Sequence, residues 1–131
     1  RKPKLMVLMV QYEVAKRICA KPPNMNLLAL SVQAYGRPKF IRKVSKKYFS
    51  PPPKVDSAVI KMSGIRNYEL GKTEKILKLA RLAFQQKRKM LRHSLKNYNL
   101  PKKYLKKRPQ ELSLENWREI VNSKYRSRKY R

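Results

Sequence analysis

Apolar and polar residues alternate in short blocks over the first half of the chain, with prolines and glycines between the blocks. Residues 5–10 form a continuous apolar run, which is typical of a strand that helices cover on both sides in a mostly parallel sheet. Residues at helical spacing follow, and Pro22 and Pro23 end the first such block. The pattern predicts, in order, a strand at residues 5–10, helices at 13–20 and 27–35, and strands at 40–44 and 57–62.

The second half of the chain has the spacing of helices. Ser63, Gly64 and Asn67 mark a break, and we place the boundary between two units near residue 66. Residues 72–98 fit one long helix with an apolar side and a basic side. The apolar side is expected to carry Ile76, Leu79, Ala80, Ala83, Phe84, Met90, Leu91, Leu95 and Tyr98, and the opposite side Lys78, Arg81, Gln85, Arg88, Lys89, Arg92 and Lys96.

A short basic turn at residues 102–107 leads into a final helix with a clear start signal. Ser113 is a natural N-cap, since its hydroxyl can accept from a free backbone N–H of the first turn. Leu112 and Trp117 occupy the two positions that pack against each other around such a cap. Residues 124–131 are rich in Lys, Arg and Tyr, and we expect them to form a disordered basic tail.

Net charge is the property of this sequence that says most about its binding partner. The chain of 131 residues has 35 Lys+Arg against 7 Asp+Glu, a formal net charge of +28. Basic residues are spread over both halves, so a single basic tail does not explain the excess. A polyanion would neutralise this charge. RNA or DNA is the expected partner, since no amphipathic or acylated anchor accompanies the basic residues as membrane binding would require.

Groups that could carry catalysis or hold a metal are scarce. His93 is the only histidine and has no acidic residue three or four positions away. Gly36, Gly64 and Gly71 do not form a phosphate-binding loop. Cys19, the only cysteine, excludes a disulfide framework and a cysteine-based zinc site, and it fits a reducing, cytoplasmic compartment. No apolar run is long enough to cross a membrane. The residues therefore favour a basic binding module without a metal.

The most distinctive stretch is residues 49–57, in a predicted extended loop over residues 48–57 that we call the proline loop. Three consecutive prolines lack N–H donors and stiffen it. An aromatic ring at Phe49 could therefore be held in place to stack on an extruded base. The residues alone favour the alternative, in which Phe49 fills the core at a sheet edge.

Lys87 lies in the middle of the apolar side of the predicted helix, between Phe84 and Met90. An unpaired ammonium group is costly to bury. Either its aliphatic stem reaches out to solvent, or the helix faces a cleft between the two units, where Lys87, Arg88 and Arg92 would meet RNA phosphates. The remaining candidate RNA contacts are Lys89, for which a solvated helix face is the alternative, and Lys54 in the proline loop.

Several motifs together resemble the small-subunit ribosomal RNA adenine dimethyltransferase family, which includes the bacterial enzyme linked to kasugamycin sensitivity. The resemblance covers almost the whole chain. The motifs occur in order as MVQYEVAKR from Met9, AKP from Ala20, LSVQ from Leu30, FSPPPKVDSAV from Phe49, FQQKRKMLR from Phe84 and ELSLENW from Glu111.

The resemblance implies an α/β fold in two parts. Residues 1–66 would be the C-terminal strands and helices of a Rossmann-like S-adenosylmethionine methyltransferase sheet, and residues 67–131 a small all-helical RNA-recognition domain with a basic tail. The family transfers methyl groups to N6 of two adjacent adenosines near the 3′ end of small-subunit ribosomal RNA, in the RNA or a subunit precursor. Phe49 matches the aromatic residue that faces the target adenine.

The family's Gly-rich cofactor loop, acidic ribose contact and Asn-Leu-Pro-Tyr motif all precede the position that matches Arg1. The resemblance therefore implies that S-adenosylmethionine is bound by an N-terminal part missing here, and that this fragment binds RNA without catalysing. One alternative is a non-catalytic RNA-binding or ribosome-associated protein that keeps the RNA-facing half of the fold. A narrower one is a large-subunit RNA methyltransferase of the antibiotic-resistance type.

Overall fold

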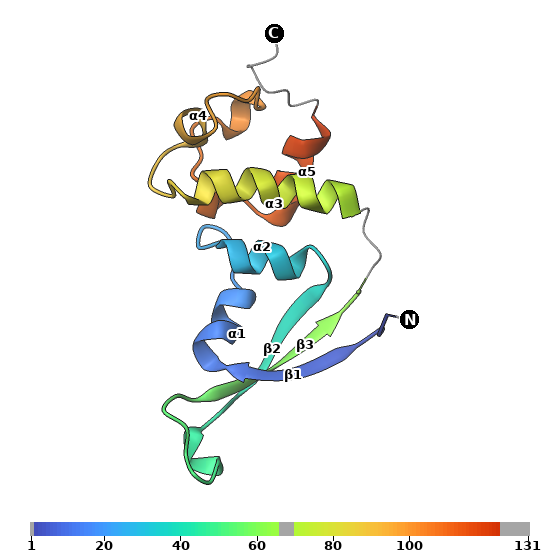
Figure 1. Ribbon diagram of the computed structural model, residues 1–131, viewed down its shortest axis with the longest axis vertical. Helices are drawn as coiled ribbons and strands as arrows, with labels where there is room; N and C mark the ends of the chain where they lie inside the picture. The colour runs from blue at the N-terminus through green and yellow to red at the C-terminus, as the bar shows by residue number, and fades with distance from the viewer. Residues whose placement is uncertain (1, 66–69, 124–131) are drawn as a thin grey trace.

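A computed structural model describes residues 2–65 and 70–123 and places a small sheet and a group of helices at opposite ends of its long axis (Figure 1). The predicted basic tail and the predicted boundary at residue 66 lie outside the described residues. The elements are β1 (Met6–Gln11), α1 (Tyr12–Ile18), α2 (Leu27–Gln33), β2 (Arg37–Val44), β3 (Ser57–Ser63), α3 (Leu70–Phe84), α4 (Leu91–Ser94) and α5 (Leu114–Asn122), with 3-10 turns η1 (Lys46–Tyr48), η2 (Lys102–Tyr104) and η3 (Pro109–Glu111).

The three strands form one sheet in the order β1-β3-β2. β3 lies in the centre and runs antiparallel to both neighbours, with Met6 opposite Met62 and Arg37 opposite Ser63. A bulge interrupts the pairing of β2 between Phe40 and Arg42. The expectation of a mostly parallel arrangement is therefore wrong for the described sheet, because β3 returns between two strands that share a direction.

β1 is not covered on both faces, which corrects the expectation from its apolar run. Val7 is 61% exposed and Met9 53% exposed. α1 reaches only the end of the strand, where Val10 is half-buried against the smaller core. An unbroken apolar run predicts burial on two faces only if elements exist to cover both, and no described element covers most of β1.

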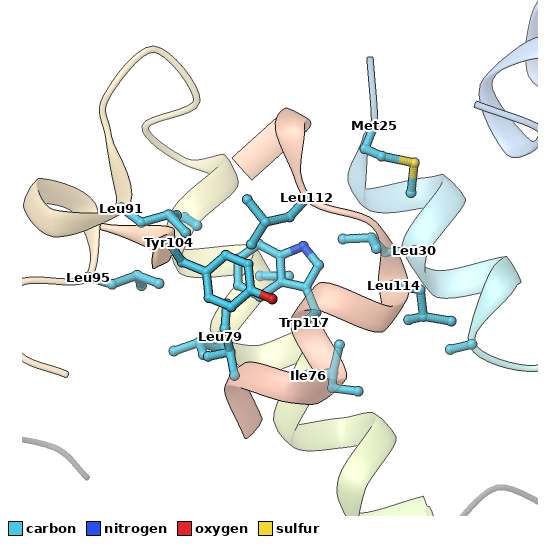
Figure 2. Close-up of a cluster of buried hydrophobic side chains, with 14 of the residues drawn as sticks. Met25, Leu30, Ile76, Leu79, Leu91, Leu95, Tyr104, Leu112, Leu114 and Trp117 are labelled. Carbon is cyan, nitrogen blue, oxygen red and sulfur yellow. The ribbon is translucent and has the colours of Figure 1, made fainter. Parts of the chain in front are cut away.

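The larger of two buried clusters joins segments from both halves of the chain. Figure 2 shows the Trp117 ring among side chains of α2, α3 and the segment before α5. Trp117 and Leu30 are fully buried, so α2 contributes its apolar face to the helical end of the molecule. The cluster is made of Met25, Ala29, Leu30, Ala34, Ile76, Leu79, Ala80, Ala83, Leu91, Leu95, Tyr104, Leu112, Leu114, Trp117 and Ile120.

The smaller cluster fixes α1 on the sheet. Ala15 and Ile18 of α1 pack on Ala58 and Ile60 of β3. These strand residues are two apart and therefore point to the same face, and the helix residues are three apart and share one side. The helical spacing puts Ala15 and Ile18 on one side, and the tertiary structure determines which strand they pack against.

The long helix predicted over residues 72–98 is wrong in its second half. α3 ends at Phe84, a turn follows, and the chain becomes helical again only for the four residues of α4. Met90 has extended backbone angles (φ −66°, ψ 151°). The N–H groups of Leu91 and Arg92 bind the carbonyls of Lys107 and Leu105 at 2.8 and 3.0 Å, so long-range bonds replace the helical ones.

The start of α5 is as predicted. The Ser113 hydroxyl accepts from the N–H of Asn116 at 3.2 Å, and the Asn116 side chain accepts from the N–H of Ser113 at 2.9 Å. This reciprocal pair satisfies two free donors of the first turn. Leu112 and Trp117 on either side of the cap are both buried.

We expect Leu30→Ala to lower the free energy of unfolding by about 2–5 kcal/mol, because it leaves a cavity where α2 meets the helical end. Denaturant unfolding followed by circular dichroism measures this. Leu82→Ala on α3 is the matched control: Leu82 is 36% exposed, and we expect a change within about 0.5 kcal/mol. Equal losses for the two variants would contradict the packing of α2 on α3 and α5.

Candidate nucleic-acid interface

The proline loop spans residues 45–56 in the structure, somewhat longer than predicted. It connects β2 to β3 and projects from the end of the molecule opposite the helices (Figure 1). Asp56 anchors its base. One carboxylate oxygen accepts from the N–H of Lys46 at 2.9 Å and the other lies 3.5 Å from the Lys43 ammonium. The backbone carbonyl of Asp56 accepts from the N–H of Tyr12 at 2.9 Å. The Lys46 N–H, followed by the Lys43 side chain, holds the pKa of Asp56 below its ordinary value.

Phe49 follows directly after η1 in this loop. Its N–H donates to the carbonyl of Lys46 at 3.2 Å, and its backbone is extended (φ −111°, ψ 146°). The side chain is half-buried and belongs to neither buried cluster. The stacking role predicted for Phe49 stays a prediction, and the alternative role as a core residue finds no support in the composition of the two clusters.

A hollow of about 240 Å³ lies at the base of the proline loop, beside the start of α1. Lys54 lines it together with Lys46. Two carboxylates also line it: Asp56 is engaged as described, and Glu13 lies 3.0 Å from Lys16. Lys54 therefore lies at the base of the loop that carries Phe49.

The second basic region, which we call the basic corner, consists of residues 85–92 and 102–108. The backbone bonds of Leu91 and Arg92 to Lys107 and Leu105 hold the two segments together. Neither segment contains an acidic residue. These bonds bring together two segments that carry exposed basic side chains: Lys87, Arg88, Lys89, Arg92, Lys102, Lys103, Lys106, Lys107 and Arg108.

A small polar network fixes the second segment of the basic corner against α5. The Tyr104 hydroxyl donates to Glu119 at 2.5 Å and accepts from the Asn116 amide at 3.3 Å. Lys103 forms an ion pair with Glu119. The Lys103 ammonium and then the Tyr104 hydroxyl lower the pKa of Glu119, while burial and then the bond to Glu119 raise the pKa of Tyr104.

Lys87 is exposed, in the turn after α3. The turn removes it from the apolar helix side, so the snorkelling explanation for its position does not apply. A cleft of about 530 Å³ lies between the sheet end and α5, and Lys87 does not line it. The residues that line this cleft are Cys19, Ala20, Lys21, Gln33, Gly36, Arg37, Pro38, Gly64, Ser113, Leu114, Glu115 and Arg118. Lys87 instead lines a hollow of about 370 Å³ with its neighbours Phe84, Gln85, Gln86, Arg88 and Lys89.

The predicted RNA contacts fall into two groups. Lys87, Arg88, Lys89 and Arg92 belong to the basic corner, whereas Lys54 and Phe49 belong to the proline loop. The proline loop lies at the other end of the long axis (Figure 1). Sequence reasoning missed the contribution of residues 102–108 to the corner. The dense run of lysines there was visible, but nothing local places it beside α4.

Candidate catalytic and metal chemistry is sparse in the described residues. Within residues 2–65 and 70–123, no three His, Cys, Asp or Glu side chains come together as metal ligands. No helix in those same ranges is long and apolar enough to span a bilayer. His93 accepts from the Arg92 guanidinium at 3.1 Å on the surface. Burial raises the pKa of the Cys19 thiol, which disfavours the reactive thiolate.

Comparison with known proteins assigns the family. The family model described as ribosomal RNA adenine dimethylase matches residues 1–127. The chain belongs to this family. It is 40% identical over 124 residues to "Ribosomal RNA small subunit methyltransferase A" of Parabacteroides distasonis, covering 86% of this chain and 46% of the relative. A relative of the same name from Flavobacterium johnsoniae is 44% identical over 115 residues, covering 82% and 44%. The chain thus spans less than half the length of these dimethylase relatives.

Solved structures show the same fold. A dimethyladenosine transferase from Plasmodium falciparum superposes with a TM-score of 0.74 at 24% identity, over 89% of this chain and 56% of that one. The 23S rRNA methyltransferase ErmE gives a TM-score of 0.64 at 19% identity, over 92% and 55%. The described antiparallel sheet and helices of this dimethylase family member are therefore a portion of a known α/β methyltransferase fold.

We expect the stabilising effect of Glu119 to depend on pH. Its pKa in the folded chain lies below the ordinary value of 4.5, so its contribution is present above about pH 4.5 and is lost as the pH falls through the lowered pKa. The difference in unfolding free energy between the wild type and Glu119→Gln should therefore shrink with acidification. Urea unfolding at a series of pH values measures it.

The same pair of measurements in a Tyr104→Phe background is the control. Removing the hydroxyl donor raises the folded pKa of Glu119 toward its ordinary value, so the acid-dependent part of the difference should become smaller. Wild-type and Glu119→Gln stabilities that stay parallel down to pH 2 would contradict the role of Glu119 in the network.

Proposed function

We propose that this chain is the RNA-binding, C-terminal part of an S-adenosylmethionine-dependent methyltransferase that dimethylates adenosines near the 3′ end of small-subunit ribosomal RNA in the cytoplasm. The observation that carries the proposal is the basic corner, where two cationic segments without an acidic residue are locked together by backbone bonds. Such a surface matches a closely spaced row of phosphates. The small-subunit substrate is inferred from relatives that share 40% or more of their residues with this chain over the matched region.

The described residues do not suit an S-adenosylmethionine site. Glu115 is the only carboxylate that lines the cleft between the sheet end and α5. One of its oxygens lies 2.6 Å from the Arg118 guanidinium, and this pairing with a cation disfavours the carboxylate as a partner for the ribose hydroxyls of the cofactor. We therefore assign cofactor binding to the part of the longer relatives that has no counterpart here, and we derive no step of methyl transfer through this chain.

The exposed apolar side chains of β1 support the proposal that this chain is one part of a larger methyltransferase fold. Leu5, Val7 and Met9 are about half exposed or more, and β1 is an edge strand with free backbone groups on one side. Exposed apolar edge strands invite pairing with further chain. We propose that β1 joins a larger Rossmann-like sheet, with residues 1–66 as its C-terminal part and residues 67–131 as the RNA-recognition unit.

Within this division, Phe49 is the residue of this chain that we assign to the target base. Its position on a stiff loop, half-buried and outside both cores, supports stacking against an adenine extruded from the RNA. Lys54 on the same loop would meet a neighbouring phosphate. Lys87, Arg88, Lys89 and Arg92 would hold a more distant stretch of the RNA at the basic corner.

We expect the combined variant Lys87→Gln, Arg88→Gln and Lys89→Gln to weaken RNA binding and to make it less dependent on salt. Each phosphate contact to single-stranded RNA contributes about 0.7 to the slope of log affinity against log salt concentration. Loss of three contacts should reduce the slope by about 2. Fluorescence anisotropy of labelled small-subunit ribosomal RNA fragments at several salt concentrations measures it.

A matched variant removes the same charges from exposed positions on α3, namely Lys75→Gln, Lys78→Gln and Arg81→Gln. This control should change the slope by less than the first variant. Equal losses would show that the RNA responds only to net charge and would contradict the assignment of the basic corner.

We expect Phe49→Ala to reduce methyl transfer by the complete protein by about 5- to 140-fold, since a stacked base contributes about 1–3 kcal/mol. Phe49→Tyr keeps an aromatic face and should retain most of the activity. The assay follows methyl groups from S-adenosylmethionine into small-subunit ribosomal RNA. Full activity of Phe49→Ala would refute the stacking role, and a wild type that binds RNA but transfers no methyl group would favour the non-catalytic alternative.

A further inference from the structure

Tyr48, the neighbour of Phe49, is the most exposed of the large hydrophobic side chains that the structure describes. It is 82% exposed, whereas Phe49 beside it is half-buried. A tyrosine ring carries a large apolar surface that is usually buried against other groups. The two successive aromatic residues therefore differ in their surroundings: the Phe49 ring is partly covered, and the Tyr48 ring is exposed to solvent.

The backbone that carries Tyr48 is held in place without help from its ring. Tyr48 ends the 3-10 turn η1, and its N–H donates to the carbonyl of Ser45 at 3.1 Å. The Ser45 hydroxyl accepts from the N–H of Lys47 at 3.3 Å, and Asp56 accepts from the N–H of Lys46 at 2.9 Å. Because the loop is fixed at both ends, exposing the ring serves no local structural purpose.

Positive charge surrounds the exposed ring along the chain. Lys46 and Lys47 precede it within the same turn, and both are exposed. The one carboxylate of the loop, Asp56, is already engaged by the Lys46 N–H and the Lys43 ammonium. Clusters of lysine are unfavourable at the centre of protein–protein interfaces, whereas an aromatic ring flanked by cations is the usual means of binding single-stranded nucleic acid.

We propose that Tyr48 is a second stacking residue, which binds an unpaired base of the same RNA strand that Phe49 contacts. Tyr48 offers its ring to the base, and Lys46 and Lys47 face the flanking phosphates. This inference rests on the proposed RNA-binding function and adds a separate subsite to it. Because the ring is solvated before binding, stacking there needs no rearrangement of the core.

The test compares the affinities of Tyr48→Ala and Tyr48→Phe for a single-stranded RNA with the adenosine-containing sequence of the small-subunit 3′ end. We expect Tyr48→Ala to bind about 5- to 140-fold more weakly, from a stacking contribution of about 1–3 kcal/mol. Tyr48→Phe should bind like the wild type. The salt dependence should stay unchanged, because no phosphate contact is lost.

Two controls separate stacking from other effects. Tyr35→Ala removes a partly exposed ring (39%) outside the loop and should leave the affinity unchanged. On a fully abasic strand of the same length, the wild type and Tyr48→Ala should bind equally, because no base is present to stack. Thermal unfolding of each variant shows whether the fold is intact.

The failure of this inference can be distinguished from failure of the proposed function. If the wild type binds RNA and Tyr48→Ala binds equally well, the second stacking site is refuted, while the proposed RNA binding stands. The exposed Tyr48 ring would then be assigned to a contact with another protein. If the wild type shows no salt-dependent binding to RNA, both proposals fail. A loss that is the same on the abasic strand would also refute stacking.

Discussion

This chain has seven Asp and Glu residues and 35 lysines and arginines. The contacts of those few carboxylates hold the backbone of both basic regions in place. Asp56 fixes the base of the proline loop through the Lys46 N–H. Glu119 holds residues 102–108 through Tyr104 and Lys103, and Glu111 accepts from the N–H of Arg108 at 2.7 Å. These carboxylates bind backbone groups and a tyrosine as well as ammonium groups. Most of the positive charge is therefore left for an external polyanion.

The apolar core adds the second constraint. Leu30 of α2 and Trp117 of α5 are buried in the same cluster, so segments from both halves of the chain share the larger packed region. The basic corner is thereby connected to the sheet end through tightly packed side chains, which deform little and fix geometry well. The proline loop and the basic corner are held at a set spacing along the long axis (Figure 1).

The two regions of this member of the ribosomal RNA adenine dimethylase family differ in the types of side chain that they expose. The basic corner has charge without an exposed aromatic ring among its basic segments, and it suits a phosphate backbone. The proline loop has Tyr48 and Phe49 beside lysines, and it suits unpaired bases. These residue types support the proposed division between a region that binds the RNA backbone and a region that binds unpaired bases.

Local sequence determined the types of element and several of their ends. Ser113 forms the predicted cap, and the helical spacing of Ala15 and Ile18 gives α1 one apolar side. The motif around Phe49 and the run from Lys87 to Lys89 were recognisable without coordinates. Only the tertiary structure decided that α3 ends at Phe84. Residues 85–89 are good helix formers, and the break depends on bonds from Leu91 and Arg92 to residues 107 and 105. The antiparallel place of β3 and the exposure of β1 are likewise settled by long-range pairing, which a periodicity of two or 3.6 residues does not encode.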